Sequence, residues 1–303
     1  MKISWLAMVL LLSFIGVTST AAEADQGFVA GADHVRIHYL QSGPTNARHT
    51  LLLIPGWRIS ASIWSKQLNY FSEHQYRVVA MDSRSQGSSD VVQTGNAPEN
   101  RAGDIQQVIS GLHLAHVTLI GWSQGAQDVA AYVDRFGTSA VESLALIDSP
   151  VSAGPNDVTE SPGFIKTILR VIASYANDPR AYSDSMMHAI ISTPTAPETY
   201  VQLDDVSLKT PTDIGISMLI QDLFTTDRRP ALKKFDKPTL VVASGKSPLL
   251  DAQRHMATAL PEGQFIAIDN ASHAVFFDQP DEFDHRLMAF VTSTSANNGT
   301  RTP

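Results

Sequence analysis

A serine with a glycine two residues before it and another two residues after it follows an apolar stretch in the middle of the chain. Residues 117–120 are apolar or β-branched, and residues 121–125 read Gly-Trp-Ser-Gln-Gly. Apolar side chains then recur at helical spacing as far as Val133. The pattern predicts a buried strand, an abrupt turn and an amphipathic helix, which would expose the Ser123 hydroxyl as a nucleophile. The start of that helix would point free N–H groups at an oxyanion formed there.

A nucleophilic serine needs a general base, and the base needs a group that orients it. His273 is the best placed of the ten histidines, because it follows the last predicted strand, at residues 264–268. Trp57, Ser123 and Asp148 also follow the ends of predicted strands. Ligands of parallel sheets bind at the carboxyl ends of the strands, so these four residues predict a single site.

Strand and helix patterns alternate along most of the chain. The predicted strands are residues 35–40, 50–54, 76–81, 117–120, 144–147, 239–243 and 264–268. This alternation predicts an α/β fold with a doubly wound, mostly parallel sheet.

One long stretch departs from the alternation. Residues 151–229 carry apolar stripes at helical spacing and no strand-like run, which predicts a helical cap. The core would then consist of residues 25–150 and 230–295. We expect the polar residues 296–303 to form a disordered tail.

The first residues have the pattern of a secretory signal peptide. Lys2 precedes an apolar run at residues 5–17, and small residues follow it. We expect residues 1–24 to be removed by cleavage near Ala22 to Ala24, in a secreted or periplasmic protein. The run is too short for a spanning helix, and the chain has no cysteine to form a disulfide.

Composition narrows the classes of partner. The chain has 303 residues, of which 43% are hydrophobic, and a formal net charge of -8. This charge argues against nucleic acid and anionic membrane surfaces as partners. His34 and His38 have a spacing that serves one metal ion on a helix, but on a strand they would lie roughly 13 Å apart. We therefore expect no metal, no cofactor and no stable membrane insertion.

At this point the chain resembles the α/β-hydrolase fold family, particularly its lid-bearing esterase, lactonase and cofactor-free haloperoxidase-like members. The resemblance covers roughly residues 35–291. It is carried by Gly-Trp-Ser-Gln-Gly at 121–125, Pro-Gly-Trp at 55–57, Asp82-x-Arg84-x-x-Gly87-x-Ser89, Ser-His at 272–273 and Gln-Pro-Asp-Glu-Phe at 279–283. It implies that Ser123 is the nucleophile, that His273 is the general base and that residues 151–229 form the lid.

The resemblance also implies an oxyanion hole. The family usually has His-Gly after this strand, where the chain has Pro-Gly at residues 55–56. The hole uses the backbone N–H of the next residue, so Trp57 can still donate. The second donor would be the backbone N–H of Gln124, directly after the nucleophile.

The acid of the triad has two candidates. Most of the family carries it shortly after the strand that ends here at residue 243, but Pro248 occupies that position. Asp251 comes later and has the pattern of a helix N-cap. A minority of the family carries the acid one strand after the nucleophile, where this chain has Asp148. We favour Asp148 and keep Asp251 as the alternative.

These residues predict a serine hydrolase acting on a carboxylic ester or lactone, with an apolar acyl compound as its small-molecule substrate. The alternatives are a cofactor-free oxygenase or haloperoxidase-like enzyme, and a ligand-binding member without turnover. Four further residues are expected to line the substrate pocket: Trp122, Phe164, Met186 and Met187.

Overall fold

The computed structural model describes residues 24–152 and 162–298. The predicted signal peptide and its cleavage site therefore lie almost wholly outside the described residues.

An eight-stranded sheet forms the centre of the molecule, in the order β1-β2-β4-β3-β5-β6-β7-β8. The strands are β1 (Asp25–Ala30), β2 (Arg36–Ser42), β3 (Thr50–Ile54), β4 (Arg77–Met81), β5 (Val117–Trp122), β6 (Val141–Ile147), β7 (Thr239–Ser244) and β8 (Gly263–Ile268). Strands β3 to β8 pair in parallel, and β1 and β2 pair antiparallel. The α/β fold with a mostly parallel sheet is confirmed.

Strand β1 was missed, because its short polar and glycine-containing sequence lacks an apolar run. It lies at the edge of the sheet beside β2, and four of its six residues are exposed. The central strand β3, by contrast, is buried throughout. That is the expected environment of a continuous apolar run covered on both faces.

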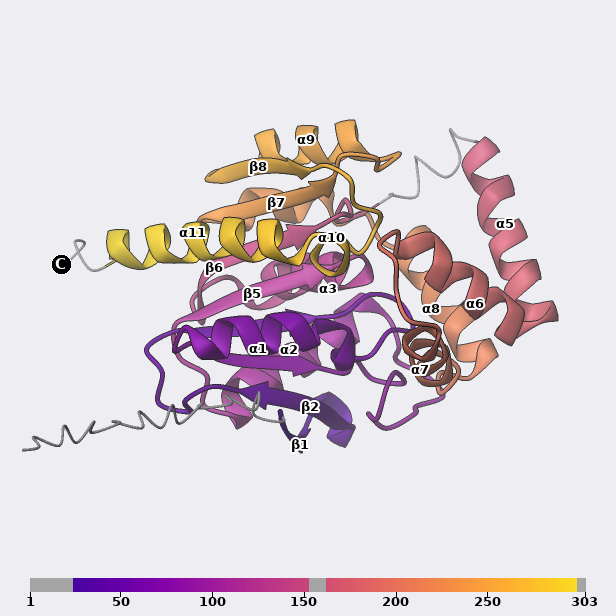
Figure 1. Cartoon of the computed structure of the whole chain (residues 1–303), viewed down its shortest axis with the longest axis horizontal. Helices are drawn as coiled ribbons and strands as arrows, with labels where there is room; N and C mark the ends of the chain where they lie inside the picture. The colour runs from indigo at the N-terminus through magenta and orange to yellow at the C-terminus, as the bar shows by residue number, and fades with distance from the viewer. Residues whose placement is uncertain (1–23, 153–161, 299–303) are drawn as a thin grey trace, which may run out of the picture.

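Helices cover both faces of the sheet (Figure 1). They are α1 (Ser65–Glu73), α2 (Pro98–Gly111), α3 (Gln124–Phe136), α5 (Pro162–Asn177), α6 (Pro179–Ile190), α7 (Pro197–Ser207), α8 (Thr212–Phe224), α9 (Leu250–Ala259), α10 (Val275–Asp278) and α11 (Pro280–Asn298). Helices α2, α3 and α9 bury their apolar residues in a first hydrophobic core on one face. Helices α1, α10 and α11 do the same in a second core on the other face.

The helices α5, α6, α7 and α8 lie together beyond the carboxyl ends of the strands (Figure 1), and we call them the cap. Residues 197–207 show no apolar stripe of their own in the sequence, because helix α7 buries few apolar side chains; Leu203 is the buried one. It begins with Pro197 at its first turn, where proline is favoured. The cap therefore covers the edge at which the predicted site residues gather.

The last helix extends into the predicted tail. It continues to Asn298, beyond residue 296, where we expected a disordered tail to begin. The hydroxyls of Thr294 and Ser295 donate hydrogen bonds to the carbonyl oxygen of Val291, so these polar side chains fit within the helix. Residues 299–303 lie outside the described residues.

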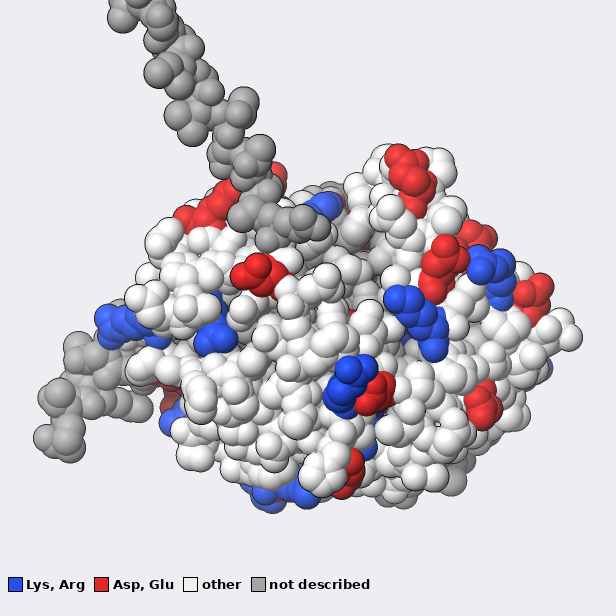
Figure 2. All heavy atoms as spheres, turned by 90° about the horizontal axis from the view of Figure 1, so that it is seen from below, with Lys and Arg blue, Asp and Glu red and all other residues white. Residues whose placement is uncertain are grey.

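The charge pattern is dispersed on the face seen from below. Figure 2 shows acidic and basic side chains scattered among neutral ones, with no broad basic surface on the described part of this face.

Candidate active site

Ser123 lies in a strained turn between β5 and α3. Its φ of 56° and ψ of -119° are unfavourable for a residue with a side chain. The turn depends on two glycines. A Cβ on Gly121 would lie 2.2 Å from the carbonyl oxygen of Gly125, and one on Gly125 would lie 2.6 Å from the carbonyl oxygen of Ile54. Strand and helix can approach this closely only without side chains at these positions, as in a nucleophile elbow.

The loop after β3 passes directly beside the nucleophile. A Cβ on Gly56 would lie 3.1 Å from the Cβ of Ser123, so the backbone of Trp57 follows at close range. Among the described residues, no protein acceptor binds the backbone N–H of Trp57 or of Gln124. Gln124 is also the first residue of α3, at the positive end of the helix dipole. Both amides are thus free to bind an anionic oxygen.

Asp148 and His273 form a hydrogen-bonded pair. Asp148 Oδ2 lies 2.8 Å from His273 Nδ1, and because a carboxylate only accepts, Nδ1 carries the proton. The other oxygen, Oδ1, accepts from the backbone N–H of Ser244 at 2.9 Å and from Gln253 Nε2 at 3.0 Å. Both oxygens of the carboxylate therefore accept hydrogen bonds, and these three bonds fix it in one orientation.

Asp148 is held in its charged form. Its side chain is only 3% exposed, and this burial raises the pKa of the carboxyl. The hydrogen bond and charge of His273, with the bonds from Gln253 and Ser244, outweigh burial and bring the pKa below its ordinary value. The His273 side chain is 33% exposed, so one member of the pair is accessible and the other is not.

The loop that carries His273 is bound both to the nucleophile strand and to the cap. The indole N–H of Trp122, the residue before Ser123, donates to the carbonyl oxygen of His273 at 3.0 Å. The backbone N–H of Ala274 donates to the carbonyl oxygen of Ile190, at the end of α6. Displacement of this loop would therefore break contacts on two sides.

Asp251 takes no part in this pair. It is exposed and lies within the first turn of α9, whose N-cap is Leu249. The prediction that Asp251 caps the helix is wrong, because the helix begins one residue earlier, at Leu250. A carboxylate in the first turn still interacts favourably with the helix dipole.

Hydrogen-bonded side chains connect the two segments that carry the backbone amides of Trp57 and Gln124. Gln86 Oε1 accepts from the backbone N–H of Arg58, the residue after Trp57. Gln86 Nε2 donates to Gln124 Oε1 at 3.2 Å, and Gln124 Nε2 donates to Asp222 Oδ2 at 2.5 Å. The two segments that supply the free amides are thus tied together, and Asp222 ties them to helix α8 of the cap.

The predicted pocket residues have different environments. Trp122 and Met187 are 1% and 0% exposed and belong to the second hydrophobic core, so they do not line an open pocket as predicted. Trp122 packs against Trp64 and Phe276, because its position at the end of a central strand points its ring into that core. Met186 is half-buried against the same core.

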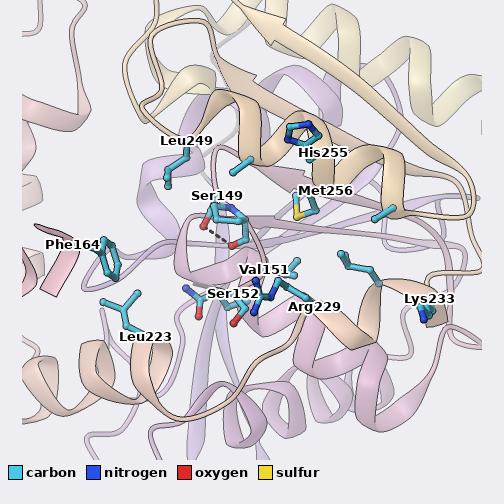
Figure 3. Close-up of a pocket in the computed structure, with 15 residues that line it drawn as sticks. Ser149, Val151, Ser152, Phe164, Leu223, Arg229, Lys233, Leu249, His255 and Met256 are labelled. Atoms are coloured by element: carbon cyan, nitrogen blue, oxygen red, sulfur yellow. Dashed lines mark hydrogen bonds between the residues drawn. The ribbon is translucent and has the colours of Figure 1, made fainter. Parts of the chain in front are cut away.

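Phe164 does line a cavity. This cavity has a volume of about 670 Å³ and lies beside the loop after Asp148, among side chains of α5, α8 and α9. Figure 3 shows Phe164, Leu223 and Leu249 at one end of it and Met256 and His255 toward the other. A second cavity of about 340 Å³ contains Asp148 and His273 and shares Leu249 with the first. Apolar surface therefore lies close to the histidine.

The described residues contain no group of three or more potential metal ligands among His, Cys, Asp and Glu. In the same part of the chain, no helix is both long enough and apolar enough to cross a membrane.

Several residues of the site could not have been found from the sequence. Gln253 lies on a predicted helix, and Asp222 on a predicted cap helix, with no local pattern that marks them. Gln86 lies within the motif between Asp82 and Ser89, and its place in that motif is the one sequence feature that could have drawn attention to Gln86. Their partners are distant in the chain, so only the fold shows their roles.

Comparisons with known proteins agree with this fold. A sequence model described as the alpha/beta hydrolase fold matches residues 49–280. The chain is 28% identical over 282 residues to a non-heme chloroperoxidase of Burkholderia pyrrocinia, covering 87% of this chain and 99% of that protein. It is 25% identical over 281 residues to a bifunctional esterase/perhydrolase of Acinetobacter calcoaceticus, covering 88% and 100%. The structure of an esterase from Exiguobacterium antarcticum shares the fold, with a TM-score of 0.76, 21% identity and coverage of 88% and 98%.

Proposed function

Because this chain belongs to the α/β hydrolase fold family, we propose that it is a serine hydrolase that cleaves a carboxylic ester or lactone. The observation that carries the proposal is the hydrogen-bonded pair of His273 and Asp148 at the sheet edge where Ser123 occupies its strained turn. An esterase/perhydrolase among the relatives supports the same reaction class.

In the proposed mechanism the Ser123 hydroxyl attacks the substrate carbonyl carbon while His273 Nε2 takes its proton. Asp148 keeps the Nδ1 proton in place, so that Nε2 is free to accept, and stabilises the imidazolium that forms. The amides of Trp57 and Gln124 bind the oxyanion. His273 then protonates the departing alcohol and takes a proton from water, which attacks the acyl-enzyme and releases the acid.

The substrate we propose is a small molecule with an apolar acyl group, since the larger cavity, which shares Leu249 with the cavity at His273, is lined largely by apolar side chains. We also propose that residues 1–24 direct export and are removed, so that the mature enzyme is secreted or periplasmic. Mass spectrometry of the exported protein tests this: a mature N-terminus near residue 23 or 25 supports it, and an intact Met1 contradicts it.

The test of the function is a panel of chromogenic esters and lactones, applied to the wild type and to Ser123→Ala. We expect turnover by the wild type and a loss on the order of 10^4-fold or more in the variant. Near-normal hydrolysis by folded Ser123→Ala would refute the mechanism. Stoichiometric labelling of Ser123 without turnover would instead indicate a binding protein.

A second candidate follows from the relatives named non-heme chloroperoxidase. Hydrogen peroxide can replace water in the last step: His273 takes a proton from the peroxide, which attacks the acyl-enzyme and releases a peroxy acid and free Ser123. The same residues are required, so the two functions differ only in the nucleophile that enters the site. Peroxide-dependent halogenation that requires a carboxylic acid and is lost in Ser123→Ala would favour this candidate.

A further inference from the structure

Helix α8 of the cap binds the side chains of both residues proposed to form the oxyanion hole. The indole N–H of Trp57 donates to the carbonyl oxygen of Gly215 at 2.9 Å. The side-chain amide of Gln124 donates to the carboxylate of Asp222 at 2.5 Å. Gly215 and Asp222 belong to the same helix, Thr212–Phe224. One cap element therefore contacts both residues that supply these amides.

Helix geometry places a third residue between these two contacts. Gly215 and Asp222 are seven residues apart, so they lie on one face of α8, separated by roughly 10 Å along its axis. Met218 is three residues after Gly215 and four before Asp222, and therefore projects from the same face. The side chain of Met218 thus lies between the points at which α8 meets Trp57 and Gln124.

The burial of Met218 agrees with this placement. Its side chain is 0% exposed. Yet among the described residues it is grouped with neither of the two hydrophobic cores on the sheet faces. Met218 is therefore a buried apolar side chain outside both cores, on the face of the helix that binds the side chains of Trp57 and Gln124.

Both ends of this face are held firmly. Asp222 Oδ1 accepts from Arg101 Nη2 at 2.6 Å, and Arg101 also binds Asp128 on α3, so a buried charged cluster fixes one end. At the other end α8 packs closely against α5, its neighbour in the cap. A Cβ on Gly215 would lie 2.7 Å from the hydroxyl oxygen of Tyr175, on α5. The position of Met218 is therefore set by the helix rather than by a mobile loop.

We propose that Met218 covers the oxyanion hole, contacts the acyl group of the substrate and limits its size. This inference rests on the proposed ester hydrolysis. A carbonyl oxygen bound by the amides of Trp57 and Gln124 brings its acyl group under the face of α8 that carries Met218. The thioether side chain is flexible and apolar, so it suits an uncharged acyl chain and adapts to its shape.

The experiment compares Met218→Ala and Met218→Phe with the wild type on p-nitrophenyl esters from acetate to octanoate. The leaving group is constant in this series, so the ratio of kcat/KM for octanoate to that for acetate reports on acyl contacts. We expect Met218→Ala to raise this ratio by about tenfold or more and Met218→Phe to lower it, since a change of pocket volume by a few methylenes has effects of this order.

The matched control is Met187→Ala. Met187 is an equally buried methionine of the cap, on α6, but it packs in the second hydrophobic core. Its loss should lower stability and leave the octanoate-to-acetate ratio within about twofold of wild type. A second ester series varies the alcohol at constant acetate, and there we expect Met218→Ala to change the relative rates little.

The outcomes separate the inference from the function on which it rests. A wild type that hydrolyses none of the esters would overturn the proposed hydrolysis, and the inference with it. An active wild type whose ratio is unchanged in both Met218 variants would overturn the inference alone. So would an equal shift in Met187→Ala, or a shift confined to the alcohol series.

Discussion

Replacing Asp148 by asparagine tests the proposed triad at its most specific contact. In the wild type, Oδ1 accepts two hydrogen bonds, from Ser244 N–H and Gln253 Nε2, and Oδ2 accepts from His273 Nδ1. Asparagine has one oxygen and one NH2 group. Both neighbours of Oδ1 are donors, so the asparagine oxygen must remain with them, and its NH2 group must face His273.

This arrangement reverses the histidine tautomer. A donor opposite Nδ1 forces that nitrogen to accept, which moves the ring proton to Nε2, where the proton of Ser123 must be received. The imidazolium also loses its negative partner. We therefore expect kcat/KM to fall on the order of 10^4-fold, which is about 5 kcal/mol of transition-state stabilisation. The free energy of unfolding should change by no more than about 1–2 kcal/mol, because the two hydrogen bonds at Oδ1 remain.

The assay is steady-state hydrolysis of the best ester found for the wild type, with urea unfolding of each variant as the check on folding. Asp251→Asn is the matched control. Asp251 is exposed in the first turn of α9, so its loss should cost at most about 1 kcal/mol of stability and leave turnover near wild type. If Asp148→Asn retained activity within tenfold of wild type while Asp251→Asn lost it, the assignment of the acid would be wrong.

Three further predictions follow from other parts of the structure. Arg101→Leu should lower the free energy of unfolding by about 3–5 kcal/mol in urea titrations, because it leaves Asp128 and Asp222 buried without their shared partner; a loss below 1 kcal/mol would contradict this. Burial raises the pKa of Asp284 to about 6, so the native state binds this proton more tightly than the unfolded chain, and stability is lost as pH rises from about 4 to 6. The Asp284→Asn variant keeps an oxygen that accepts from Gln67 but has no carboxyl to titrate. Its free energy of unfolding should therefore rise relative to that of the wild type by at most about 3 kcal/mol between pH 4 and 7. Parallel pH profiles of the two proteins would refute this. EDTA should leave ester hydrolysis unchanged, and an activity that EDTA abolishes and zinc or calcium restores would show that a metal site exists.

Local sequence patterns predicted the elements that are stabilised by their own periodicity. The all-apolar run at residues 50–54 became the buried central strand β3, and the strand-turn-helix pattern around Ser123 became β5 and α3. Patterns failed where burial was slight: β1 at the sheet edge, α7 in the cap and the polar end of α11. Elements with little apolar surface give little periodic signal, because neighbouring chain segments decide whether they form.

By itself the sequence determined the fold class and the positions of Ser123 and His273, since a strained turn and a strand end are local features. It reduced the acid to Asp148 or Asp251. The tertiary structure decided which of them meets His273, because that contact spans 125 residues of chain and depends on how β6 and the loop after β8 are placed. The cap methionines show the same division. Helical spacing identified Met186 and Met187 as apolar, but the packing of the cap buries Met187 in the second core and leaves Met218 buried outside both cores, because the face that a helix presents is set by what it packs against.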